Sequence, residues 1–108
     1  MYYSKSDWKL FQERIPIWQE AYMDKLLKEY IRLLEGLELP SAKFWKLKQQ
    51  MAEDVKSPGV LIKMTKKDML FSIVDLIALG AITINDLEGF SNELIQSVEF
   101  QLNIINHT

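Results

Sequence analysis

Few residues of this chain combine the side-chain types and spacings that catalysis or metal binding requires. Its one histidine, His107, is the second-last residue, where we expect no pocket to form around it. Carboxylate pairs one helical turn apart, such as Glu20 and Asp24, are compatible with metal binding, yet such pairs are usually solvated surface. Glu53 and Asp54 are adjacent, so their side chains diverge and do not easily grip one ion. The sequence therefore predicts no catalytic, metal or cofactor site.

The cysteine and glycine content of the chain provides no further candidate for a catalytic or binding site. The chain has no cysteine, which excludes a disulfide framework, a zinc-thiolate cluster and a thiol nucleophile, and which fits a reducing cytoplasm. The four glycines stand singly at expected helix ends, so they form no phosphate-binding loop. The longest apolar run, 69–84, is interrupted by Asp75 and Gly80, and no signal-peptide pattern opens the chain. We therefore expect a cytoplasmic protein that is not an enzyme and does not enter a membrane.

The elements that would position any site are helices throughout. The 108 residues, of which 48% are hydrophobic, correspond to one domain with its own core. No long stretch alternates apolar and polar residues as a strand does, and no hairpin turn of the Asn-Gly or Asp-Gly type occurs. The sequence predicts an all-α fold in which residues 1–108 form a single-domain bundle of about five helices.

The first helix is predicted to start near residue 5 and to end before Gly36. Ser4 can cap its first turn, and Asp7 can return a hydrogen bond to the backbone N–H of the cap. Its apolar residues recur every three or four positions: Trp8, Phe11, Ile15, Trp18, Tyr22, Leu26 and Tyr30. Pro16 removes one hydrogen bond from this stretch, so we expect a kink or a break there.

Further helices follow at intervals set by turn residues. The second helix, capped by Ser41, is predicted to end before the turn at 57–59 and to bury Phe44, Leu47, Met51 and Val55. Residues 60–64 are expected to form a connector or a single helical turn. Helix 69–79 is apolar around most of its circumference, which places it at the centre of the bundle. A short helix at 83–88 follows, and the last helix is predicted to bury Leu94, Val98, Leu102 and Ile105.

Charge is distributed unevenly along the chain, although the formal net charge is only −2. Residues 41–67 carry seven lysines and two acids, whereas residues 68–108 carry six acids and neither lysine nor arginine. The lysines form a candidate basic patch: Lys43, Lys46, Lys48, Lys56, Lys63, Lys66 and Lys67. The acids form a candidate acidic face: Asp68, Asp75, Asp86, Glu88, Glu93 and Glu99. Either the two segments pack together and neutralise each other, or one of them binds a partner of opposite charge.

Two functional alternatives follow from these charges. The basic patch has Trp45 among its lysines, a combination that can hold a nucleic-acid backbone, although the patch contains no arginine. The acidic face would instead suit an acidic nucleic-acid mimic or an inhibitor of the anti-defence type. Both alternatives involve binding and no catalysis.

Aromatic residues favour a third hypothesis, which we place first. Nine of the twelve aromatic residues lie within the first 45 positions. Tyr2, Tyr3 and Trp8 begin this stretch, and exposed aromatic side chains are typical anchors of protein interfaces. We therefore predict a non-enzymatic helical protein that acts through protein–protein contacts, either as a homo-oligomer or on a different protein.

Four runs of the sequence, SDWKLF at 6–11, WQEAYM at 18–23, SPGV at 57–60 and ITINDLEGFS at 82–91, point to a resemblance. Together they resemble a group of small uncharacterised all-helical proteins of low-GC Gram-positive bacteria, often found on mobile elements. The resemblance implies a cytoplasmic bacterial accessory protein, whose protein partner would belong to the host or the mobile element, or whose acidic face would act as an anti-defence inhibitor for a mobile element. It transfers no functional residue, because the group has no established catalytic or binding site.

Overall fold

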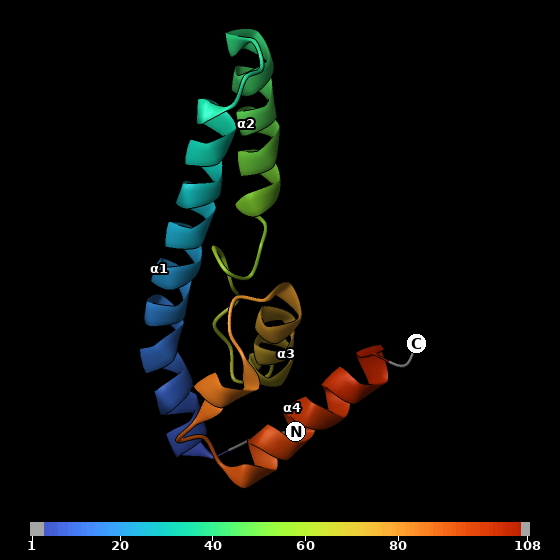
Figure 1. Cartoon of the computed structure of the whole chain (residues 1–108). Coiled ribbons are helices and arrows are strands. Elements are labelled where there is room, and N and C mark those ends of the chain that lie inside the picture. The colour runs from blue at the N-terminus through green and yellow to red at the C-terminus, as the bar shows by residue number, and fades with distance from the viewer. Residues whose placement is uncertain (1–3, 107–108) are drawn as a thin grey trace.

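A computed structural model of the chain describes residues 4–106. These residues form four α-helices and one short 3-10 helix, without a strand (Figure 1). In chain order the elements are α1 (Lys5–Glu35), α2 (Pro40–Asp54), α3 (Met69–Leu79), η1 (Ile84–Leu87) and α4 (Asn92–Asn106). The predicted all-α class is confirmed, and the count is four α-helices plus η1 where about five helices were expected.

Helix α1 runs without interruption through Pro16. The expected break at this residue does not occur, although proline removes the hydrogen bond to the carbonyl one turn before it. Ile15 and Trp18, which lie on either side of Pro16, are both buried in the same core cluster. This shared packing holds the two parts of α1 in one helix and offsets the lost hydrogen bond.

The core covers only the N-terminal half of α1 (Figure 1). Helices α3 and α4 pack against each other and, with η1, against this half of α1. The buried cluster consists of Phe11, Ile15, Trp18, Met69, Ile73, Val74, Leu76, Ile82, Leu87, Phe90, Leu94 and Val98. We call this part of the molecule the body. Helix α3 lies within it as predicted, with Ile73 and Leu76 fully buried.

A buried carboxylate joins the two ends of the body. Asp7 is 2% exposed, and its two oxygens accept hydrogen bonds from the backbone N–H and hydroxyl of Ser91, at 2.8 and 2.6 Å. The hydroxyl of Ser91 in turn accepts from the N–H of Leu94 in the first turn of α4. Ser4 caps α1 as predicted by accepting from the N–H of Asp7. The Asp7 carboxylate therefore binds the start of α4, 84 residues along the chain, where the sequence predicted a local cap of α1.

Element η1 is held against α1 by Arg14. The guanidinium donates to the backbone carbonyls of Asp86 and Glu88, at 2.9 Å each, and lies over the ring of Phe90. The predicted capping of this short helix is confirmed, because Thr83 and Asp86 form a reciprocal box. Glycine is favoured at position 89, where φ is +99° and a Cβ atom would lie 3.2 Å from the side chain of Leu10.

Helix α2 lies beyond the body and packs against the C-terminal half of α1 (Figure 1). It contains no buried residue. The prediction that Phe44, Met51 and Val55 are core residues is therefore wrong, and Leu47 is only partly buried. Ser41 does not cap this helix, which begins at Pro40 with no side-chain cap.

The segment between α2 and α3 explains why α2 stays uncovered. Residues 61–65 have no helical structure, so the predicted connector is confirmed, and the segment carries the chain back to the body. It is anchored on α1 by the amide of Gln19, which donates to the carbonyl of Pro58. Gly59 lies against Tyr22, where a Cβ atom would fall 2.3 Å from a ring carbon. The chain thus turns away from α2 before α3 begins.

The end of α4 also differs from the prediction. Leu94 and Val98 are buried as expected, and Leu102 is half-buried against the core. Ile105, however, is 47% exposed near the C-terminal end of α4.

Candidate functional site

Carboxylates do not gather into a metal site in the part of the chain that the structure describes. No group of three or more acidic or histidine side chains among residues 4–106 could hold a metal ion. Of the carboxylate pair considered from the sequence, Asp24 forms an ion pair with Lys28 at 2.9 Å, and both side chains are exposed. His107 lies outside the described residues.

The lysines of the candidate basic patch lie in different parts of the structure and contact different groups. The Lys43 ammonium donates to the carbonyl of Leu34 in the last turn of α1, at 2.7 Å, which matches the negative end of that helix dipole. Lys46 pairs with Glu38 at 2.5 Å. These two lysines therefore close the turn between α1 and α2 and are not free to form a separate binding surface.

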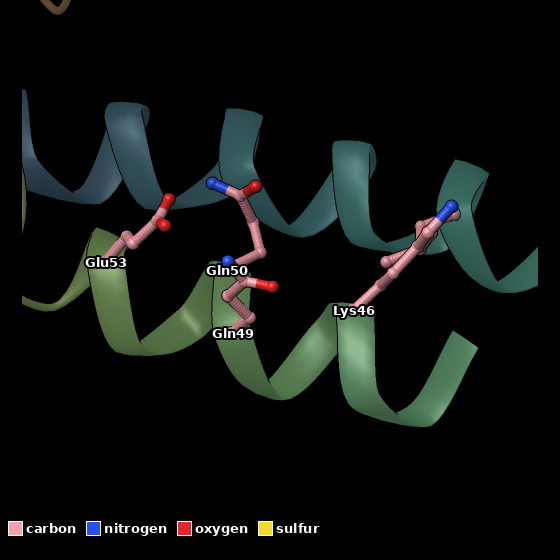
Figure 2. A pocket seen from close by; sticks show the side chains of 5 residues that line it. Lys46, Gln49, Gln50 and Glu53 are labelled. Carbon is pink, nitrogen blue, oxygen red and sulfur yellow. The ribbon is translucent and has the colours of Figure 1, made fainter. Parts of the chain in front are cut away.

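Lys46 also borders a polar groove between α1 and α2. Figure 2 shows the side chains of Lys46, Gln49, Gln50 and Glu53 reaching from α2 toward α1. The groove has a volume of about 260 Å³, and Leu33 completes its lining. Lysine and glutamate share this groove, so it is not a uniformly basic surface.

Other lysines lie beside acids. Lys56 and Lys63 line a hollow of about 350 Å³ together with Asp68 and Asp75. Lys63 approaches Asp68 at 3.9 Å. Lys48 lies over the ring of Trp45, 5.2 Å from its centroid, and Lys66 and Lys67 are exposed in the turn before α3.

The candidate acidic face is likewise spread over several elements. Asp68 hydrogen-bonds Thr65, and Asp86 caps η1, so both carboxylates have local structural roles. The remaining members are exposed on α3, after η1 and on α4: Asp75, Glu88, Glu93 and Glu99. Within residues 4–106 the 3.9 Å contact of Lys63 with Asp68 is the one ion pair that joins the basic and acidic segments. Helix α2 packs on α1, so its lysines are not neutralised by α4.

Three aromatic residues were predicted to be interface anchors, and the structure describes one of them, Trp8. Tyr2 and Tyr3 lie outside the described residues. Trp8 is half-buried, and its ring stacks on that of Phe11 with centroids 5.8 Å apart. Trp8 therefore contributes to the edge of the core in the described chain.

Several exposed apolar side chains lie together on the pair α1 and α2. We call this surface the hairpin face, and it is formed by Leu27, Ile31, Leu34, Phe44, Met51 and Val55. Their exposed fractions lie between 45% and 63%. The three α1 residues recur at steps of four and three, and the α2 residues at steps of seven and four, so each set forms one helical stripe. The two stripes run side by side along the antiparallel helices.

A shallow apolar cavity of about 190 Å³ lies within the hairpin face. Its lining is almost entirely aliphatic or aromatic: Met23, Leu26, Leu27, Tyr30, Met51, Asp54, Val55 and Val60. The hydroxyl of Tyr30 donates a hydrogen bond to the carboxylate of Asp54, which is also bonded by Gln50. This bond ties α1 to the end of α2 and satisfies the one charged group of the cavity.

We predict an abnormal titration of Tyr30. Burial against α2, followed by the hydrogen bond and the negative charge of Asp54, raises the pKa of Tyr30 from 10.0 to about 12. Because the pKa in the folded state is the higher one, the stabilisation is complete below pH 10 and is lost as the pH rises through about 12. The difference in tyrosinate absorbance between the natural protein and Tyr30→Phe should report this titration, and a midpoint near 10 would contradict the contact.

A sequence signal for the hairpin face existed in α1. Leu27, Ile31 and Leu34 have helical spacing but lie to one side of the main stripe that ends with Leu26 and Tyr30. The main stripe alone predicts one contact surface on α1, and the prediction from it assigned the apolar face of the second helix to the core. A second apolar stripe on one helix indicates a second contact surface.

The exposed surfaces of the chain, above all the hairpin face, provide the evidence for its function. Comparison with models of protein families, with curated proteins and with solved structures gave no match. No helix within residues 4–106 is long and apolar enough to cross a membrane. The hairpin face is thus the feature whose chemistry most directly suggests a function.

Proposed function

We propose that this chain is a non-enzymatic cytoplasmic protein that acts through protein–protein contacts, with the hairpin face as the contact surface. The observation that carries the proposal is that α2 buries none of its residues while it presents Phe44, Met51 and Val55 to solvent. A helix with such a stripe is stable mainly when another element covers the stripe. A partner would supply that cover.

The size of the hairpin face supports this proposal. Six large side chains, each about half exposed, present on the order of 500 Å² of apolar surface, a size at which patches on monomers are often functional. Removing that area from water is worth about 10 kcal/mol before the entropy losses of association are subtracted. A surplus of a few kcal/mol after those losses is enough for specific binding.

The shape and residue types of the hairpin face also suit a protein partner. Two antiparallel helices with a shallow apolar cavity between them form a groove of the kind that receives the apolar side of another helix. Phe44 and Trp45 stand edge to face on α2, with centroids 5.1 Å apart. Aromatic residues at the centre or rim of a contact carry a large share of binding energy.

A photocrosslinking experiment tests this function. The photoreactive amino acid benzoylphenylalanine replaces Phe44 in one variant and Phe100 of α4 in a control variant, and both side chains are 63% exposed in the natural protein. After irradiation in living bacteria, we expect discrete protein adducts from position 44 and none of equal yield from position 100. Equal, diffuse labelling at both positions would contradict the proposal, and adducts to nucleic acid would favour binding through the adjoining lysines.

A further inference from the structure

We infer that the occupant of the hairpin face is a second copy of this chain, placed so that α1 of each copy lies along α2 of the other. This inference rests on the proposed function and names its partner. The result is a four-helix arrangement of two hairpins in which every neighbouring pair of helices is antiparallel. Two-fold symmetry makes the contact self-complementary, so that it closes at a dimer.

The body does not obstruct this approach. Trp18 faces the body, where its ring stacks on that of Phe90 with centroids 6.3 Å apart. Leu27 follows Trp18 by nine residues, which is two and a half helical turns, so it lies on the opposite side of α1. The hairpin face is therefore open on the side of α1 that is turned away from the body.

The hairpin face has one outer edge on α1 and one on α2. The charges along these two edges favour a second copy of the chain as the partner. On α2 the outer edge carries Lys48, one turn from both Phe44 and Met51, and then Lys56 beyond the end of the helix. No acid of α2 accompanies Lys48 on that edge, because Asp54 points to Tyr30 and Glu53 borders the polar groove on the other side. Lys56 also borders the hollow that contains Asp68 and Asp75.

The outer edge of the hairpin face on α1 has the opposite sign. Asp24 lies one turn before Leu27, and Glu35 lies one turn after Ile31. Lys28 is the one cation along this edge, and it is already paired with Asp24. The four groups Asp24, Glu35, Lys48 and Lys56 are all exposed and lie at the rim of the proposed contact, where Asp24 would exchange its pairing with Lys28 for one across the interface.

These edges distinguish the possible arrangements of two copies. With α1 against the partner's α2, the acidic edge of each copy meets the lysine edge of the other, twice in each dimer. With α1 against α1 and α2 against α2, acids would meet acids and lysines would meet lysines. Charge complementarity therefore favours the first arrangement.

The area is sufficient for a dimer of moderate affinity. About 500 Å² of apolar surface per copy, with a polar rim around it, approaches the roughly 800 Å² per partner of a standard stable interface. We expect the dimer to dissociate on dilution, because its formation follows mass action.

The first test measures the oligomeric state by sedimentation over a range of protein concentrations. We expect a reversible monomer–dimer equilibrium for the natural protein. Phe44→Gln should raise the dissociation constant at least tenfold, whereas Phe100→Gln, which removes an equally exposed phenylalanine from α4, should leave it unchanged. Circular dichroism checks that both variants keep their helices.

The second test reverses the charges of the two edges. One variant carries Lys48→Glu with Lys56→Glu, and the other carries Asp24→Lys with Glu35→Lys. Each alone should raise the dissociation constant about tenfold or more, because like charges then face each other twice. An equimolar mixture should recover a heterodimer of nearly natural affinity, since both contacts again join opposite charges.

The outcomes separate this inference from the proposed function. A natural protein that stays monomeric at high concentration overturns the inference, and charge variants that dimerise like the natural protein overturn the arrangement. If a monomeric protein still gives discrete adducts from position 44 in cells, the hairpin face binds a different protein and the proposed function stands. A monomer without such adducts contradicts both.

Discussion

Replacing Leu76 by alanine is expected to lower the free energy of unfolding by about 2 to 5 kcal/mol. Leu76 is fully buried in the body, where α3, α4 and the N-terminal half of α1 meet. Its removal leaves a cavity that helices fixed by other contacts cannot fill. Urea unfolding followed by circular dichroism measures the change.

The matched control for this prediction lies on the same helix. Leu79 is 38% exposed at the end of α3, so Leu79→Ala removes the same atoms with a smaller change in buried surface and leaves a space that water can enter. We expect it to lower the free energy of unfolding by less than half the loss seen for Leu76→Ala. Equal losses would mean that α3 is not buried in the way described.

Replacing Asp7 by asparagine is expected to lower the free energy of unfolding by about 1.5 to 3 kcal/mol, as is typical for hydrogen bonds to a charged group. The carboxylate accepts two hydrogen bonds from Ser91 in a buried position. The amide nitrogen of asparagine can only donate, so the Ser91 hydroxyl loses its acceptor, and the remaining hydrogen bond loses the negative charge that strengthens it. The free energy of unfolding of both proteins can be compared in urea.

Two further variants isolate the contribution of this contact. Asp75→Asn removes the same charge from an exposed position on α3 and should change the free energy of unfolding by less than about 0.5 kcal/mol. Ser91→Ala should be destabilising, and combining it with Asp7→Asn should cost less than the sum of the two single changes. Strict additivity would show that the two residues do not interact.

Helix ends were predicted well because the signals that set them act over a few residues. Ser4 caps α1, Thr83 and Asp86 cap η1, and Gly80 ends α3 in the left-handed conformation that glycine adopts without strain. Two local signals failed, because Ser41 does not cap α2 and α1 continues through Pro16. The effect of Pro16 on α1 depended on whether Ile15 and Trp18 would share one core, which is a long-range property.

The candidate site was predicted less well for a related reason. Asp7 was interpreted as a local cap, yet its carboxylate is satisfied by Ser91 at the far end of the chain. The lysines of α2 looked like one patch, but Lys43 and Lys46 are used at the turn between α1 and α2. A side chain's partner in space cannot be found from its neighbours in sequence.

Local patterns in the sequence are enough to predict that the chain is helical, where most helices end, that α2 has one apolar stripe and that α3 is apolar nearly all round and therefore buried. The tertiary structure was needed to show that the stripe of α2 is exposed. Periodicity specifies which side chains share a face of a helix, but what covers the face depends on where the chain goes next. Here the segment after α2 packs Gly59 against Tyr22 and returns to the body, so α3 and α4 cover the first half of α1 and leave the hairpin face open.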